Sequence, residues 1–151
     1  YTSIEFRGNL QTHYNNKSLL LINNHPMHNI VNGSYYLEQI PVEAIEKIEI
    51  IRGPGSILYG TNAFAGVIKV VTKSGKANEG FDLKLTAGSF GSISPSISFG
   101  KKAKDLELFV NISLNDSKGF PFIVEGDEEG RNGEIDYKND LLNSLVSLKY
   151  K

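Results

Sequence analysis

An acidic stretch between residues 125 and 136 has the residue types that most resemble a functional site. Glu125, Asp127 and Glu129 alternate and Gly130 stands sixth, which is the spacing of a calcium-binding EF-hand loop. However, Glu125 opens the stretch where such loops need Asp, Asp136 closes it where they need Glu, and no flanking helices are predicted. We therefore interpret the stretch as a solvated acidic loop and predict no metal site.

The motifs of common enzyme classes are missing from the sequence. Residues 52–60 are rich in glycine but lack the Gly-Lys-Ser/Thr ending of a phosphate-binding loop. Neither His-Glu-x-x-His nor Gly-x-Ser-x-Gly occurs, and cysteine is absent, which excludes disulfides and thiolate metal ligands. No nucleophile or acid–base constellation stands out. The sequence therefore predicts a protein that is not an enzyme and carries no cofactor.

Composition excludes further classes of function. The formal net charge of the 151 residues is −1 and charged residues make up 22%, so no basic surface for nucleic acid is predicted. No run approaches the roughly 18 apolar residues of a membrane-spanning helix, so a membrane role would require β-strands or a peripheral contact. Because the sequence begins with neither Met nor a secretory signal, we expect it to start inside a longer protein.

The pattern of residues 1–75 predicts short strands, glycine turns and little helix in this part of the chain. An Asn-Gly pair at 32–33 predicts a turn. Pro41–Lys47 has proline at its start, acids early and lysine late, as expected for a short helix, and one helical turn is predicted at Ser56–Tyr59. Apolar or alternating runs predict strands at Thr2–Phe6, Leu19–Ile22, Ile48–Ile51 and Val67–Lys73, with Leu19–Ile22 buried.

Residues 80–151 show a different pattern, in which apolar and polar residues alternate over four long segments. Period-two alternation predicts a sheet with one apolar face. Tight turns are predicted at Phe90-Gly91 and Lys101–Lys104, and a long polar connection at Asp116–Asn139. Short turns alternating with long loops are typical of transmembrane barrels, although an ordinary soluble antiparallel sheet fits the alternation equally well.

One long motif distinguishes these alternatives. Residues 48–60 read IEIIRGPGSILYG and residues 63–73 read AFAGVIKVVTK, which together closely resemble the plug signature of TonB-dependent receptors, including Gly53, Pro54, Tyr59, Gly60 and Gly66. Two earlier segments resemble other plug strands in the same order: residues 4–8 an I-x-IRG strand, and residues 19–28 a VLIDGVPV strand and turn. The departures are Ala65 for the usual glycine, Lys69 for the usual asparagine and Asn23 for the usual aspartate.

This resemblance implies a fold class and a location. We expect an α+β plug domain with a small mixed sheet and short helices over residues 1–75. Antiparallel β-strands of an incomplete transmembrane β-barrel would follow over residues 76–151. The protein would lie in the cell outer membrane of a Gram-negative bacterium, with the plug inside the barrel and facing the periplasm. The partner protein TonB would bind a segment that precedes residue 1.

The resemblance also implies a function. The whole protein would be an active transporter whose plug gates the barrel and helps to bind a scarce nutrient such as an iron–siderophore, haem or cobalamin. Two alternatives remain open at this stage. One is a soluble β-rich ligand-binding domain, and the other is a receptor of the same family for a glycan or a peptide.

Family resemblance further suggests site residues. Plug loops that face outward would touch the ligand, and their candidate contacts in this chain are His13, Tyr14, His28, Asn29, Tyr35 and Tyr36. Taken singly, each is more often an ordinary loop residue. Arg7 and Arg52 would lock the plug to barrel glutamates beyond Lys151, unless they only cap turns in solvent. Gly53, Gly60 and Gly66 are expected at sharp turns, and Tyr59 in a partly buried contact.

Overall fold

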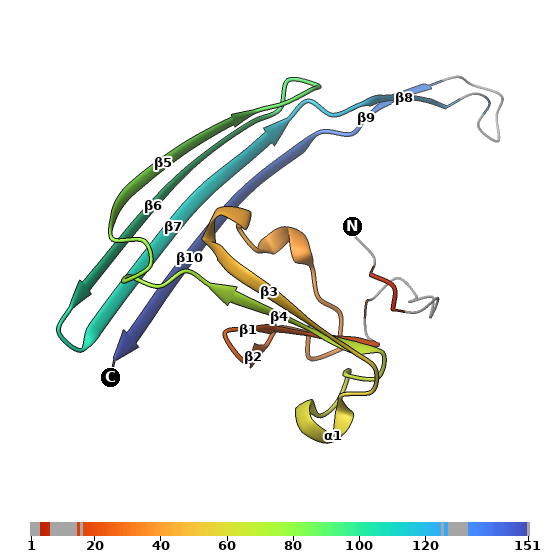
Figure 1. Cartoon of the computed structure of the whole chain (residues 1–151). Helices are drawn as coiled ribbons and strands as arrows, with labels where there is room; N and C mark the ends of the chain where they lie inside the picture. The colour runs from red at the N-terminus through yellow and green to blue at the C-terminus, as the bar shows by residue number, and fades with distance from the viewer. Residues whose placement is uncertain (1–3, 7–14, 16, 125, 127–132, 151) are drawn as a thin grey trace. The chain divides into compact units, whose positions relative to one another are not determined.

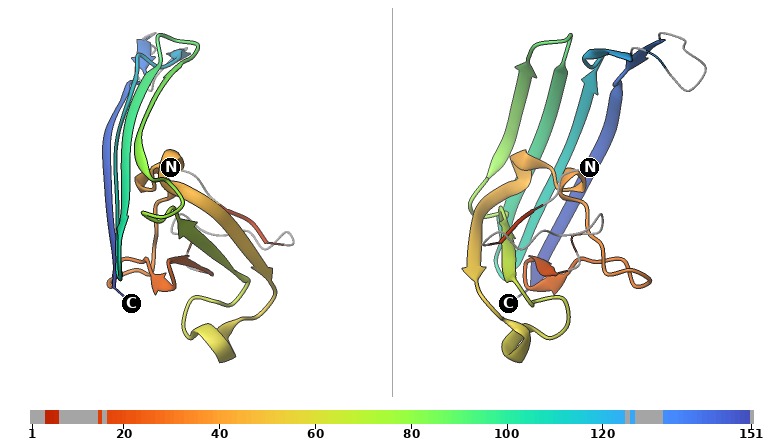
Figure 2. Two further views of the ribbon diagram at one scale, coloured as in Figure 1. Left: turned by 60° about the vertical axis from the view of Figure 1, so that its left-hand side comes forward. Right: turned by 90° about the vertical axis from the view of Figure 1, so that its right-hand side faces the viewer.

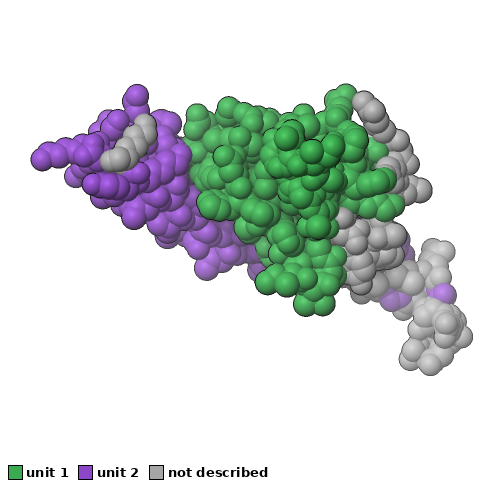
Figure 3. Space-filling view, turned by 90° about the horizontal axis from the view of Figure 1, so that it is seen from below, with its two compact units in different colours: residues 1–73 green, residues 74–151 purple. Residues whose placement is uncertain are grey.

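The computed structural model describes residues 4–6, 15, 17–124, 126 and 133–150. By its internal contacts the chain divides into two compact units, residues 1–73 and residues 74–151, which Figure 3 colours separately. The sequence pattern places this division at residues 75 and 76. Within the described residues, no helix has the length and apolar content needed to cross a membrane.

The first unit is built on a four-stranded mixed sheet. In spatial order its strands are β2 (His25–Pro26), β1 (Ser18–Ile22), β4 (Gly66–Thr72) and β3 (Ile45–Arg52). Strand β1 runs parallel to β4, and β3 pairs with β4 antiparallel (Figure 1). Thus three of the segments that the sequence predicts as strands lie side by side, with β4 in an inner position of the sheet.

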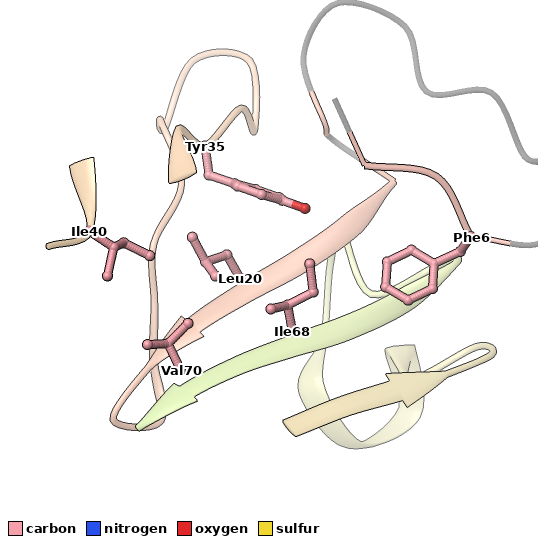
Figure 4. Close-up of a cluster of buried hydrophobic side chains, with 6 residues drawn as sticks. All are labelled: Phe6, Leu20, Tyr35, Ile40, Ile68 and Val70. Carbon is pink, nitrogen blue, oxygen red and sulfur yellow. The ribbon is translucent and has the colours of Figure 1, made fainter. Parts of the chain in front are cut away.

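Both faces of the central strands are buried. On one face Leu20, Ile68 and Val70 pack with Phe6, Tyr35 and Ile40 (Figure 4). On the other face Leu19 and Leu21 pack with Ala63 and Val67. A strand covered on both faces needs a continuous apolar run instead of an alternating one, and Leu19–Ile22 has such a run. The prediction of a buried strand there is confirmed.

The prediction of a helix at Pro41–Lys47 is wrong for most of its length. A single 3-10 turn, η2, covers Val42–Ala44, and a second, η1, covers Leu37–Gln39. Strand β3 already begins at Ile45, and its β-branched residues pair with β4 through a register shift between Ile45 and Lys47. Pairing with a central strand overrides the weak helix propensity of so short a segment.

The signature glycines serve two different purposes. Gly53 and Gly60, at φ +106° and +82°, take conformations that other residues avoid, as predicted for turns around α1 (Ser56–Tyr59). Gly66 is not at a turn, so that prediction is wrong. It is a buried residue of β4, where a Cβ atom would come within 2.7 Å of the Phe6 ring and 2.8 Å of the Ile51 carbonyl oxygen. Close packing across the sheet therefore requires glycine there.

The second unit is a long, curved antiparallel sheet (Figures 1 and 2). Its spatial order is β10 (Asn139–Tyr150), β7 (Leu106–Ser117), β6 (Ile93–Ala103) and β5 (Gly80–Ala87). A two-stranded ribbon, β8 (Pro121–Val124) and β9 (Gly133–Asp136), occupies the long connection between β7 and β10. The alternating segments are thus the strands that the sequence predicts.

Strand register places the apolar residues on one face of this sheet. Directly paired residues lie on the same face, and the pairs include Leu83↔Ile97, Ile97↔Ile112 and Val110↔Val146. That face is open, since Leu83 is 76% exposed and Val146 69%. The opposite face is buried around Phe109 and Asn111, and the Asn111 amide nitrogen donates to the hydroxyls of Ser96 at 3.1 Å and Ser98 at 2.9 Å.

The connections of the sheet differ in length at its two ends. A turn at Phe90-Gly91, both at positive φ, joins β5 to β6 as predicted. The turn between β6 and β7 consists of Lys104 and Asp105, slightly later than the predicted Lys101–Lys104. The connection from β7 to β10, at the same end as Phe90-Gly91, spans residues 118–138. The long connection and the two-residue turn therefore lie at opposite ends.

Candidate functional site

A pocket of about 330 Å³ opens in the first unit beside strands β1 and β2. Its floor is apolar and includes Leu20 and Ile40, which are buried. Its rim is polar and exposed, since it carries His28, Asn29 and Gln39. The complete lining consists of Leu20, Ile22, Pro26, Met27, His28, Asn29, Ser34, Tyr35, Tyr36, Gln39 and Ile40. An apolar floor with a few converging polar groups is the usual make-up of a small-molecule site.

The loop over residues 27–36 is folded by its own hydrogen bonds. The Asn29 amide donates to the Ser34 carbonyl at 2.7 Å, and the Gly33 amide donates to the Asn29 carbonyl at 2.8 Å. The side-chain oxygens of Asn29 and Asn32 accept from the amides of Val31 and Ser34 at 2.8 and 3.0 Å. These are Asx turns, and Gly33 at φ +71° completes the predicted Asn-Gly turn.

Tyr35 forms the inner wall of the pocket and belongs to the core. Its side chain is 4% exposed, and its hydroxyl lies 2.5 Å from the Ser18 hydroxyl (Figure 4 shows the ring among the core side chains). Burial raises the pKa of Tyr35 above its ordinary value of 10.0, an effect that the hydrogen bond with Ser18 partly offsets. Tyr35 therefore shapes the pocket, while Tyr36, 44% exposed, presents an aromatic edge at its rim.

The structure brings four of the six predicted ligand contacts together at this pocket: His28, Asn29, Tyr35 and Tyr36. His13 and Tyr14 lie outside the described residues. Sequence reasoning missed Met27 and Gln39, which also line the pocket. Met27 is next to His28 in sequence, but no sequence signal marks Gln39, because only the fold of the intervening loop brings it to the rim.

The remaining candidate positions are placed as follows. Arg52 ends β3 and is exposed, and it makes no ion pair with the part of the chain that the structure describes. Arg7 and most of the acidic stretch 125–132 fall outside the described residues. Tyr59, in α1, is exposed at 38% of its surface, so the structure does not show the partly buried contact that is expected from the sequence. Among the described residues no group of three or more His, Asp or Glu could hold a metal ion.

Electrostatic interactions of the first unit gather outside the pocket. The ammonium groups of Lys47 and Lys69 lie 2.6 and 3.4 Å from the two carboxylate oxygens of Glu49. Hydrogen bonds from these two lysines lower the pKa of Glu49. The three residues lie on β3 and β4 and none lines the pocket. None of the described residues that line the pocket is Lys, Arg, Asp or Glu.

Comparison with known proteins connects this site to a family. Residues 1–67 match the family model described as the TonB-dependent receptor plug domain. Over 76 residues the chain is 41% identical to the vitamin B12 transporter BtuB of Vibrio vulnificus, an alignment that covers 50% of this chain and 12% of that protein. Over 107 residues it is 29% identical to BtuB of Vibrio cholerae, with coverage of 65% and 17%. The chain thus spans less than a fifth of these relatives.

A solved structure resembles more of the chain. The FrpB iron transporter from Neisseria meningitidis superposes with a TM-score of 0.66 at 16% sequence identity, over 89% of this chain and 22% of that one. At this level of identity the likeness concerns the fold alone. Because it covers 89% of the chain, it includes residues of both units.

Proposed function

We propose that this chain is part of an outer-membrane active transporter of the TonB-dependent receptor family, because residues 1–67 match the plug-domain model and the chain is similar to BtuB. In this proposal residues 1–73 are plug and residues 74–151 supply the first strands of the barrel wall. The plug gates the barrel, binds a scarce nutrient from outside and is remodelled when TonB pulls on it. Such a change requires no covalent chemistry, only a difference in ligand affinity between two plug conformations.

The observation that carries this proposal is the reversed polarity of the second sheet. In a water-soluble sheet the apolar face is covered, whereas here it is open, and the buried face carries mostly polar side chains (Ser96, Ser98, Asn111 and Ser113) beside Phe109. A transmembrane barrel needs this arrangement, because its outer face contacts lipid and its inner face contacts polar surroundings. The apolar face continues across all four long strands through their register.

Strand length fits the same interpretation. β7 and β10 each have 12 residues, which corresponds to about 40 Å at roughly 3.3 Å per residue. A tilt of about 45° reduces this to about 28 Å, close to the roughly 30 Å hydrocarbon thickness of a bilayer. By the usual asymmetry of such barrels, the two-residue turn Lys104-Asp105 would face the periplasm and residues 118–138 would face outward.

Nutrient binding would use the plug pocket. Its rim residues His28, Asn29 and Tyr36 are the predicted contacts that remain accessible. Iron–siderophore, haem and cobalamin are the candidate ligands, in keeping with the relatives named as vitamin B12 and iron transporters. Arg52 would meet a barrel glutamate, since an exposed Arg at a strand end suits bidentate carboxylate pairing.

The test uses the full-length protein. We expect it in the outer-membrane fraction, and we expect the purified receptor to bind cyanocobalamin, haem or an iron chelate saturably, as followed by tyrosine fluorescence. His28→Ala and Tyr36→Ala should weaken that binding. Phe64→Ala is the matched control, because Phe64 is 66% exposed but lines no part of the pocket.

Two results would change the proposal. Absence from the outer membrane would refute the transporter and favour the soluble ligand-binding domain. Correct location without binding of any metal-containing ligand would leave the family intact and point to a glycan or peptide receptor.

A further inference from the structure

On the premise of the proposed function, we infer that the plug pocket selects neutral metal chelates that carry amide or hydroxyl groups, and rejects chelates that carry several negative charges. The inference concerns the ligand class of the same site and starts from its charge. None of the eleven lining residues is Lys, Arg, Asp or Glu. Residues 18–37, which supply most of the lining, contain none of these four types either.

The absence of cations matters for anionic ligands. A polyanionic chelate loses hydration as it enters a pocket, and only opposite charges or strong donors compensate for that loss. The charged residue next to Gln39 in sequence is Glu38, an acid outside the pocket lining. Among the described basic residues of the first unit, Lys47 and Lys69 are paired with Glu49, and Lys17, Arg52 and Lys73 do not line the pocket. The described residues that line the pocket therefore offer an anion no Lys or Arg side chain.

Neutral ligands, in contrast, meet several uncommitted polar groups. Within the described part of the chain, no hydrogen bond is made by the His28 imidazole, the Tyr36 hydroxyl, the Gln39 carboxamide or the Asn29 side-chain nitrogen. Together they provide both donors and acceptors. Amides and hydroxyls on a ligand periphery satisfy such groups without any charge.

An apolar surface adjoins these polar groups. Ile30 and Val31, at the tip of the loop that carries His28 and Asn29, are 96% and 93% exposed. The hydrogen bonds within this loop fix its backbone, so little ordering is left to occur on binding. Together with the buried floor, the tip matches the apolar parts of a bulky neutral chelate and offers nothing to a small hydrated anion.

The experiment compares ligands of different charge on the full-length receptor. Dissociation constants are measured for cyanocobalamin, a neutral ferric trihydroxamate and an anionic ferric tricatecholate. We expect at least one neutral chelate to bind at least about tenfold more tightly than the tricatecholate. Gln39→Lys should shift that preference about tenfold toward the anion, as one charge at a partly solvated site can.

Thr61→Lys is the matched control, because it makes the same change in net charge at an exposed position outside the pocket. It should leave the preference unchanged. Tighter binding of the tricatecholate by the unaltered receptor would overturn the inference and keep the proposed function. Equal shifts from Gln39→Lys and Thr61→Lys would overturn the role of the pocket. Binding of none of the three ligands would overturn the inference and, for a receptor found in the outer membrane, point to the glycan or peptide receptor.

Discussion

Arginine substitutions at two depths of β7 test whether the open face of the second sheet contacts lipid. Ile112 lies near the middle of the strand, and Leu106 is its first residue, beside the two-residue turn. Both side chains are on the apolar face, and their exposed fractions are nearly equal, 45% and 41%. A difference between Ile112→Arg and Leu106→Arg therefore reports depth in a membrane and not local burial.

Strand geometry gives the expected size of that difference. Six residues separate the two positions, about 20 Å along the strand, or about 14 Å of depth at a tilt of roughly 45°. This is about half of a 30 Å hydrocarbon core, so Ile112 lies near the midplane when Leu106 lies at the interface. Arginine then costs about 2–4 kcal/mol at Ile112 and about 0–1 kcal/mol at Leu106. On a water-exposed surface both changes would stay within about 0.5 kcal/mol.

The assay is equilibrium unfolding in denaturant of the full-length receptor refolded into lipid vesicles, with unfolding and refolding curves required to coincide. The free energy of unfolding of Ile112→Arg should fall below that of Leu106→Arg by about 1–4 kcal/mol. Equal effects within about 0.5 kcal/mol, or a larger loss at Leu106, would refute the lipid-facing assignment.

Three further predictions concern the fold. Because burial raises its pKa, Tyr35 should lose its proton at a higher pH than a tyrosine with the ordinary pKa of 10.0. Its contribution to stability is complete below pH 10.0 and is lost as the pH rises through the raised pKa, and Tyr35→Phe should remove a step above pH 10.0 from the ultraviolet tyrosinate titration. Asn23 donates a hydrogen bond to the buried Thr72 hydroxyl at 2.8 Å and accepts one from the Thr72 amide at 3.0 Å. Asn23→Ala should therefore lower the free energy of unfolding by about 1–3 kcal/mol. Asn23→Asp keeps an acceptor for that amide and should lower it less. Gly100→Ala should lower the thermal unfolding temperature of the receptor, since a Cβ there would clash with the backbone carbonyl oxygen of Asn78, and an unchanged temperature would contradict this. Gly88→Ala, whose Cβ would meet its nearest atom at 3.6 Å, should have little effect.

Sequence patterns predicted the strands well where a single physical cause dominates. The unbroken apolar run at residues 19–22 predicted a strand buried on both faces, and β1 is buried in this way. Period-two alternation predicted the long strands of the second unit. The helix predicted at residues 41–47 was wrong, because short-range propensity is weak compared with pairing to a central strand.

The candidate site shows a similar limit. Tyr35 and Tyr36 are adjacent and chemically identical, so the sequence could not separate them. The fold places one ring in the core and the other at the pocket rim. Gln39 carried no signal, since its place in the site depends on the path of the loop before it.

By itself, the sequence determined the family resemblance, the strands and the absence of charge over residues 18–37, because these depend on residue type and order. Only the tertiary structure decided which face of each long strand is open and which side chains surround the pocket. Strand register fixes which residues share a face, and loop closure brings together residues far apart in sequence. Both arise from contacts between segments, which a local pattern does not contain.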